Sequence, residues 1–160
     1  LEAEVLIDAL CQITGTTEEY SSPIPEPFTF IPEDQRSIAL SDGSITSSFL
    51  EMFGRPPRDT GLESERSNRP TPAQRLHLLN SSHIRKKIEQ AQKALARNGS
   101  KDKPGDAVAA VYLTILSRFP TERELKAVQA YAESGEVNPQ EALLDVSWAL
   151  INSPEFLYRH

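Results

Sequence analysis

The sequence predicts an all-α fold, a helical bundle of six or seven helices with a long Pro-rich N-terminal strap. Three capping sequences, at Thr71, Thr121 and Asn138, each mark the start of a helix. In such a sequence the N-cap side chain and a Glu or Gln three residues later satisfy two backbone amides that would otherwise be unpaired. Apolar residues then recur at helical spacing. Since the connections after residue 71 are short, we expect the main bundle to span residues 71–160.

Composition favours a single folded domain over residues 1–160. The chain has 160 residues, 38% of them apolar and 25% charged, which is enough to bury a core without a metal or a disulfide. Its net charge of −6 argues against a nucleic-acid partner. No apolar run approaches the roughly 20 residues that span a bilayer, so we expect no membrane insertion. The chain begins with Leu1 and lacks a signal-peptide pattern, so we expect it to be a fragment of a longer chain.

The first element is a helix over residues 2–14. Its apolar residues follow the spacing of one helical face, on which we place Val5 and Leu6, and Gly15 supplies the conformational freedom that ends a helix. Cys11 is the chain's only cysteine, so no internal disulfide can form. Because it follows the trace of the apolar face, we interpret it as a small core residue rather than a nucleophile.

Residues 16–45 form the predicted strap. Four prolines fall within ten positions of it, and proline fixes φ and removes a backbone donor, which favours extended chain that packs its aromatic residues onto a neighbour. We expect one short strand or hairpin at residues 36–40, followed by a turn at 41–43. A short helix over residues 46–53 then ends at Gly54.

The remaining elements are helices separated by polar breaks. Asp106 is the expected cap of the third of these helices, and Lys87 is placed on an outward face. We expect helices over residues 71–80, 83–98, 106–116, 121–134 and 138–151, and one more turn from residue 153. The expected core of the C-terminal end joins Trp148, Leu150, Phe156 and Leu157 to Val111, Ile115 and Leu116.

Arginine dominates the segment between residues 55 and 75, which holds five Arg and no Lys. Because guanidinium groups bind carboxylates and other anions in a bidentate manner, this pattern indicates pairing rather than mere solubility. One hypothesis is a site for an anionic ligand such as a sulfated or uronic sugar. The hypothesis we favour is an internal ion-pair network with the interleaved acids. The candidate binding residues are Arg55, Arg58, Asp59, Glu63, Glu65, Arg66, Arg69 and Arg75.

The sequence contains only weak signals for metal binding or catalysis. His77 and His83 are six residues apart, which places them on different helical faces, and no Cys or HExxH pattern accompanies them, so we assign no metal ligand. Asp59 with Glu63 or Glu65 could form paired carboxylates of the kind that cleave glycosides, but sequence proximity does not establish their separation. No nucleophile or phosphate-binding motif is found. We therefore assign no catalytic residue and favour a non-enzyme.

Several motifs resemble one known family. FGRP, ESER, HLLNS, the stretch YLTILSRFPTERELKAV and the closing NSPEF occur in consistent order over nearly the whole chain. Together they resemble the planctomycete-specific C-terminal domain of unknown function found in multidomain planctomycete-type cytochrome c proteins. Relatives often carry Cys beside the acidic position of TGLESER, where this chain has Gly61, Leu62 and Ser64, so no thiol-based role is carried over.

The resemblance implies a setting rather than an activity. It implies a bacterial, extracytoplasmic location, periplasmic or at the cell surface, and a module that follows a haem domain and a second associated domain. Haem is expected only in another domain of the parent protein, with no cofactor in this fragment. We therefore expect a non-catalytic interaction or structural module whose partners are other domains of its parent. The alternative is a ligand-binding or hydrolytic module for an anionic polysaccharide that uses the arginine segment.

Overall fold

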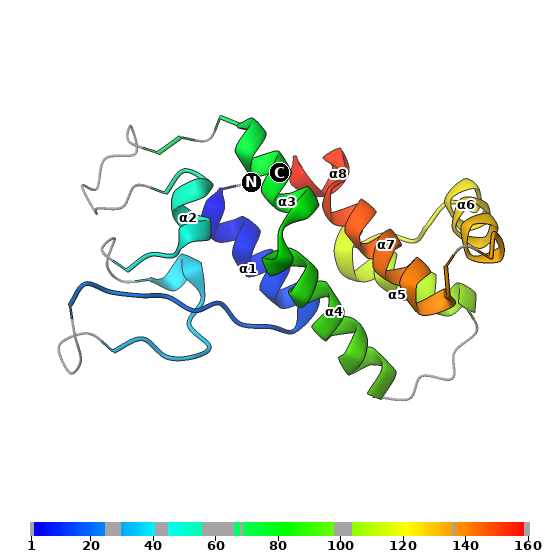
Figure 1. Ribbon diagram of the computed structural model, residues 1–160, viewed down its shortest axis with the longest axis horizontal. Helices are drawn as coiled ribbons and strands as arrows, with labels where there is room; N and C mark the ends of the chain where they lie inside the picture. Colours follow the sequence, from blue (N-terminus) through cyan, green and yellow to red (C-terminus); the bar gives the residue numbers. More distant parts are fainter. Residues whose placement is uncertain are drawn as a thin grey trace. The chain divides into compact units, whose positions relative to one another are not determined.

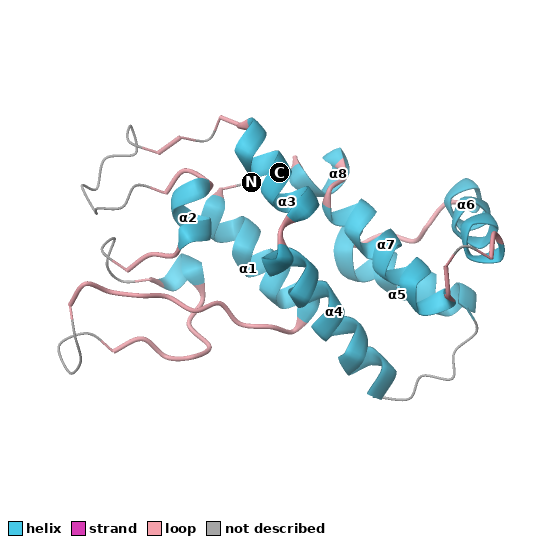
Figure 2. Ribbon diagram, in the orientation of Figure 1, coloured by secondary structure: helices cyan, strands magenta, loops and turns pink. Residues whose placement is uncertain are grey.

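The part of the chain that the structure describes consists of helices and loops (Figures 1 and 2). The computed structural model describes residues 2–24, 30–40, 45–55, 66–67, 69–97, 104–135 and 137–158, and no strand occurs among them. The predicted all-α class is thus confirmed. The chain divides into two compact units, Leu1–Asn80 and Ser81–His160. The single domain over 1–160, and a main bundle that starts at residue 71, stay predictions.

Within the described residues, six of the α-helices have nine residues or more. The first unit contains α1 (Ala3–Thr14), the 3₁₀-helix η1 (Ser37–Ala39), α2 (Ser48–Met52) and α3 (Pro72–Asn80). The second unit contains α4 (Ser82–Arg97), α5 (Pro104–Leu116), α6 (Glu122–Glu133), α7 (Pro139–Ile151) and α8 (Pro154–Leu157).

Helix α1 is where the sequence predicts it, but its buried face differs from the predicted one. Gly15 ends the helix in the left-handed conformation, with φ of 62°. Leu6 and Ile7 are buried, whereas Val5 is 39% exposed and the prediction for it was wrong. The reason is that the buried face also includes Glu4 and Asp8, whose carboxylates find partners there. Apolar spacing alone does not indicate a buried acid.

The strap is non-helical in its described residues apart from η1. Among the described residues, it makes one isolated antiparallel bridge, between Ser21 and Thr46. The strand predicted at 36–40 is wrong, because η1 occupies this position. The amides of Ser37 and Ile38 donate to the carboxylate of Asp8, at 2.7 and 3.1 Å, and are therefore not available for strand pairing. The predicted turn at 41–43 lies outside the described residues.

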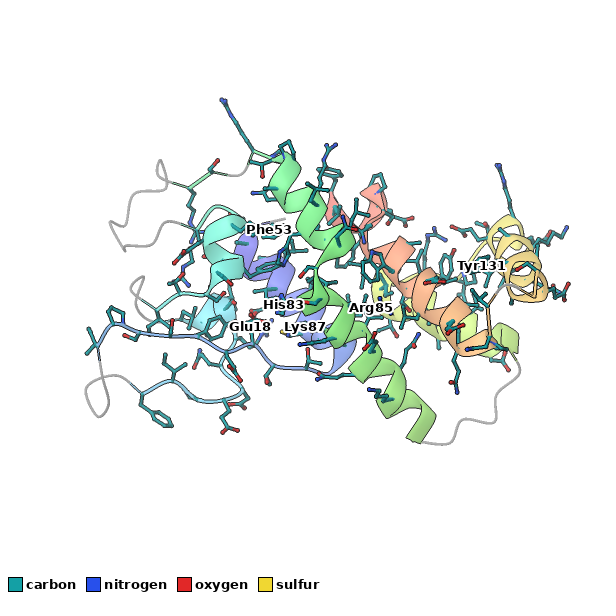
Figure 3. All side chains as sticks on the ribbon, viewed as in Figure 1. Glu18, Phe53, His83, Arg85, Lys87 and Tyr131 are labelled. Atoms are coloured by element: carbon teal, nitrogen blue, oxygen red, sulfur yellow. The ribbon has the colours of Figure 1, made fainter. Side chains whose placement is uncertain are left out.

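Helices α2 and α3 meet through aromatic rings. Phe49 of α2 is buried and stacks on Phe53 with ring centroids 4.2 Å apart. His77 of α3 lies edge-on to both rings, at 5.7 and 6.0 Å, and Figure 3 labels Phe53 in this cluster. The predicted helix over 46–53 is thus confirmed, with its start shifted to Ser48, and Ser47 is its N-cap.

All three predicted capping sequences begin helices. The amide of Thr71 donates to Gln74 at 3.0 Å, and the amide of Gln74 donates back to the Thr71 hydroxyl at 3.3 Å. Thr121 and Asn138 form complete capping boxes at the starts of α6 and α7. Each cap contributes about 1 kcal/mol and uses partners only three residues apart, which is why the sequence suffices to locate them.

Two details of the second unit correct the sequence analysis. Helix α5 begins at Pro104, so Asp106 lies in its first turn and is not its N-cap. Lys87 of α4 is only 6% exposed rather than outward-facing, because it lies three residues after Ile84 and next to Ile88, both of which are buried. Arg85, on the exposed side of the same helix, pairs with Glu89 one turn later at 2.8 Å.

The second unit packs around α7, which contacts α4, α5, α6 and α8. Tyr131 of α6, labelled in Figure 3, donates to Asp145 of α7 at 2.7 Å. The predicted C-terminal core is confirmed in its location, since α5 also contacts α8. The buried members are Leu150, Phe156, Ile115 and Leu116, and the half-buried members are Trp148, Leu157 and Val111.

Truncating Phe156 tests this core. Phe156 is 7% exposed, so Phe156→Ala is expected to lower the free energy of unfolding by about 3 kcal/mol through lost burial and a residual cavity. Tyr158→Ala is the matched control, because Tyr158 is 49% exposed and its truncation should cost less than about 1 kcal/mol. Urea denaturation measures both. Equal stability of Phe156→Ala and the unsubstituted chain would show that α8 is not part of the core.

Candidate functional site

A glycine holds the start of the arginine segment beside its middle part. Gly54 has φ of 98°, and a Cβ at this position would lie 2.1 Å from the carbonyl oxygen of Ser67. The amide of Ser67 donates to the carbonyl of Gly54 at 3.2 Å. No side chain fits between these two backbones, so glycine is required here for close approach as well as for its φ. The contact brings Arg55 and Arg66, which flank it, toward the same partner.

That partner is Glu4 of α1, a residue that the sequence analysis did not single out. Arg66 binds both oxygens of the Glu4 carboxylate, with Nη1–Oε2 at 3.0 Å and Nη2–Oε1 at 2.8 Å. Arg55 places its Nε 3.4 Å from Oε1 and donates through Nη1 to the carbonyl of Ile45 at 3.2 Å. Glu4 and Arg55 are 4% and 8% exposed. We call these three residues the Glu4 cluster.

The electrostatics of the cluster keep Glu4 ionised. Burial by itself raises the pKa of Glu4, but the hydrogen bonds from Arg66 and the positive charges of Arg66 and Arg55 outweigh it, and the pKa lies below its ordinary value. A buried carboxylate is costly unless it is paired and hydrogen-bonded. Two guanidinium groups on one carboxylate meet that requirement. The cluster therefore fastens the loop after α2 and residue 66 to α1.

A second carboxylate lies one turn further along α1. Asp8 is 8% exposed and accepts from the amides of Ser37 and Ile38, as described above. Its Oδ2 also lies 3.5 Å from Nε of Arg36. Glu4 and Asp8 thus stand four residues apart on one face of α1; Glu4 binds two arginines from loops, and Asp8 binds the 3₁₀-helix η1. The sequence signal was present, because two acids at this spacing interrupt an otherwise apolar helix face.

The other predicted site residues are either exposed or outside the described residues. Arg69 and Arg75 are exposed. Arg58, Asp59, Glu63 and Glu65 lie outside the described residues, so their pairing with the arginines stays a prediction.

The structure also places the histidine and the cysteine that the sequence analysis considered. His77 belongs to the aromatic cluster with Phe49 and Phe53. In the part of the chain that the structure describes, no group of three or more His, Cys, Asp or Glu could hold a metal ion. Cys11 is half-buried rather than a core residue, and it lines a cavity beside α1. Among these same residues, no helix is long and apolar enough to cross a membrane.

The second unit has its own charged cluster, centred on Arg118, which the sequence analysis also missed. Arg118 binds Glu124 at 2.8 and 3.0 Å and Glu155 at 2.8 Å through both Nε and Nη2. Its guanidinium carbon lies 5.4 Å from the centre of the Tyr112 ring. Arg118 therefore joins the loop after α5 to the first turn of α6 and to α8. The hydrogen bonds from Arg118, and then that from the backbone of Thr121, lower the pKa of Glu124 to about 2.

The fold and the two charged clusters, around Glu4 and Arg118, define the class of protein. The chain is an all-α protein whose described arginine clusters tie its own segments together. The comparison with protein families then places it: residues 1–132 match the model of PSD1, described as a protein of unknown function (DUF1553). The chain belongs to this family. Neither the curated proteins nor the solved structures contain a match to the chain.

Removing Glu4 tests the first cluster. Glu4→Ala is expected to lower the free energy of unfolding by about 3 kcal/mol near pH 7, because Arg55 would stay buried without its counter-ion. Glu2→Ala is the control, since the Glu2 side chain is 51% exposed and lies 3.9 Å from Arg66. Chemical denaturation measures the difference between the two variants. A similar, small loss in both would contradict the assigned role of Glu4.

The loss of stability in Glu4→Ala should depend on pH in a definite direction. Because the pKa of Glu4 is lowered in the folded chain, its contribution to stability is fully present above the unfolded value of roughly 4.3 and is lost as pH falls through the folded value. The gap in stability between the unsubstituted chain and Glu4→Ala should therefore narrow as the pH falls below about 4.3. A gap that widens on acidification would contradict this assignment.

The Arg118 cluster is tested by the titration of one carboxyl group. In the intact chain the side-chain carbon of Glu124 should titrate by NMR with a pKa of about 2. In Arg118→Gln that pKa should rise toward the ordinary value for glutamate, because the strongest hydrogen bonds to the carboxylate are gone. Arg123→Gln, an exposed neighbour, should leave the titration of Glu124 in place. Identical titrations in all three proteins would exclude Arg118 as the cause.

Proposed function

We propose that this chain is a non-catalytic interaction or structural module at the C-terminal end of a multidomain planctomycete-type cytochrome c protein. Its partners are other domains of that parent, its location is extracytoplasmic, and any haem belongs to another domain. Membership of a family described as of unknown function is compatible with this proposal. The parent context rests on the resemblance of the FGRP, ESER, HLLNS and NSPEF motifs.

The observation that carries the proposal is the outward display of apolar side chains along the strap. Phe30 is 76% exposed, Ile38 is 58% exposed and Ile24 is 43% exposed. The backbone that bears Ile38 is nevertheless held, because its amide donates to Asp8. A fixed backbone that presents large apolar groups to water is typical of a surface that docks onto a partner.

The arginine segment supports the same conclusion. Arg55 and Arg66 bind Glu4 within the first unit, so these two guanidinium groups act in the fold rather than as an open anion site. An anionic polysaccharide remains the second candidate ligand because Arg69 and Arg75 are exposed. That candidate predicts binding that weakens steeply with salt, whereas apolar docking of the strap predicts a weak salt dependence.

The test is binding of this chain to the remaining domains of its parent protein. We expect crosslinks and a measurable affinity, and we expect Phe30→Ala with Ile38→Ala to reduce that affinity at least tenfold, because the exposed apolar groups supply the contact. Phe119→Ala is the matched control, since Phe119 is a 69% exposed phenylalanine of the second unit. Calorimetry or biolayer interferometry measures the affinities.

Two outcomes would overturn the proposal. One is no binding to any parent domain. The other is binding to a panel of sulfated and uronic glycans that Arg69→Gln with Arg75→Gln abolishes and that the strap variants leave unchanged.

A further inference from the structure

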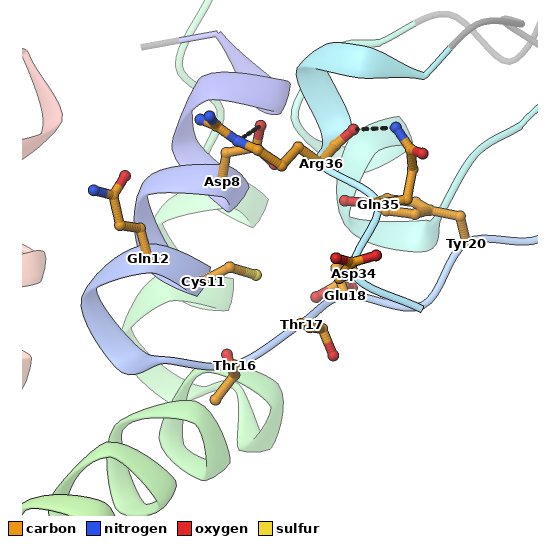
Figure 4. Close-up of a pocket in the computed structure, with 10 residues that line it drawn as sticks. All are labelled: Asp8, Cys11, Gln12, Thr16, Thr17, Glu18, Tyr20, Asp34, Gln35 and Arg36. Atoms are coloured by element: carbon orange, nitrogen blue, oxygen red, sulfur yellow. Dashed lines mark hydrogen bonds and ion pairs between the residues drawn. The ribbon is translucent and has the colours of Figure 1, made fainter. Parts of the chain in front are cut away.

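A cavity of about 320 Å³ lies beside α1 in the first unit (Figure 4). Its walls are residues from α1, from the start of the strap at 16–20 and from the segment 34–36. This volume falls at the lower end of the range that holds small ligands. The function proposed above makes no use of this cavity.

The walls of the cavity are fixed by hydrogen bonds. Asp8 holds the backbone of Ser37 and Ile38, and its Oδ2 lies 3.5 Å from Nε of Arg36. The hydroxyl of Tyr20 is hydrogen-bonded to that of Ser37, which joins the start of the strap to the same point. The amide of Gln35 closes a turn by donating to the carbonyl of Pro32 at 3.1 Å. These bonds hold Tyr20 and residues 35–38, which include part of the cavity wall, in place beside α1.

The lining has the chemistry of a site for hydroxyl groups. Glu18 and Asp34 supply carboxylate acceptors, Gln12 supplies an amide that both donates and accepts, and Thr16 and Thr17 supply hydroxyls. No aliphatic side chain is among the described residues that line the cavity. Most ligand pockets are largely apolar with few polar groups. A lining this rich in polar side chains instead suits a ligand that carries several hydroxyl groups.

The charges and the aromatic ring narrow the class of ligand. Three carboxylates line the cavity, from Asp8, Glu18 and Asp34, against the one guanidinium group of Arg36, so anions are repelled. Burial, opposed by the Ser37 hydroxyl and assisted by the charge of Asp8, raises the pKa of Tyr20 to about 12. Tyr20 also contributes an aromatic ring to the lining, and an aromatic ring is a surface against which the carbon side of a sugar can pack.

We propose that this cavity binds a small uncharged polyhydroxylated ligand, such as one unit of a neutral sugar. Such a ligand offers many O–H donors to the carboxylates of the lining, and it carries no negative charge that they would repel. The site differs from the arginine segment in both position and charge. A neutral sugar here is therefore a separate proposal from an anionic polysaccharide there.

The test is an NMR titration of the 160-residue chain with four probes. These are the methyl glycosides of glucose and N-acetylglucosamine, a heparin-derived sulfated disaccharide, and putrescine as an organic cation. We expect at least one of the neutral glycosides to produce saturable shifts of the amides of Gln12 and Asp34. We expect smaller or no shifts at these amides with the other two probes.

Two variants of equal charge decide whether the cavity is the site. Asp34→Asn removes an acceptor from the lining, and we expect it to weaken binding of the neutral glycoside at least fivefold. Glu33→Gln makes the same change of charge at the neighbouring exposed residue, which does not line the cavity, and we expect it to leave binding unchanged. Both side chains are exposed, so both variants should melt like the unsubstituted chain.

Four results would overturn the proposal. Binding of putrescine alone would make the cavity a cation site, and binding of the sulfated disaccharide alone would contradict the charge argument. Absence of binding by both neutral glycosides would likewise refute a sugar site, as would binding that Asp34→Asn leaves intact.

Discussion

The buried carboxylate of Glu4 is the constraint on which much of the first unit depends. An ionised group at 4% exposure is tolerated only where its charge and its hydrogen-bonding capacity are satisfied, and Arg55 and Arg66 satisfy both. Because these two arginines are eleven positions apart, their convergence needs the close approach of Gly54 to Ser67. The charge of Glu4 thus accounts for three features of this unit. They are the face of α1 that is buried, the contact between Gly54 and Ser67, and the position of Arg66.

The second unit is held together mainly by apolar packing rather than by a buried ion pair. Its helices share an apolar core around α7, and its charged cluster is half-exposed: the side chain of Arg118 is 31% exposed and that of Glu155 is 39% exposed. Exposed ion pairs contribute little on average, so we interpret this cluster as fixing the direction in which α8 leaves α7 rather than as the main source of stability. It also gives a structural role to two of the motifs that carry the family resemblance, because Arg118 belongs to SRFPTERE and Glu155 to NSPEF.

The sequence was sufficient wherever a structural signal is local. A capping box spans three residues and its chemistry is complete within them, so the starts of α3, α6 and α7 were predicted correctly. The partner of Arg66 lies 62 positions away in the chain, and no spacing rule connects them. The strand predicted at 36–40 failed for the same reason, since the amides that it needs donate to Asp8, about 30 positions earlier. Nearby acids were therefore expected to pair with the arginines, and distant ones were overlooked.

Asp8 links the two proposals made for the first unit. The segment that it holds, residues 36–38, presents Ile38 to solvent and also forms part of the cavity wall through Arg36. A partner that contacts Ile38 and a sugar that contacts the wall therefore act on the same few residues of backbone. If one of them shifts that backbone, the affinity for the other must change, and the effect is reciprocal by thermodynamic linkage. Asp8 limits the size of that shift because it binds the backbone of this segment. The more firmly it binds, the less a ligand at one surface changes the affinity of the other surface.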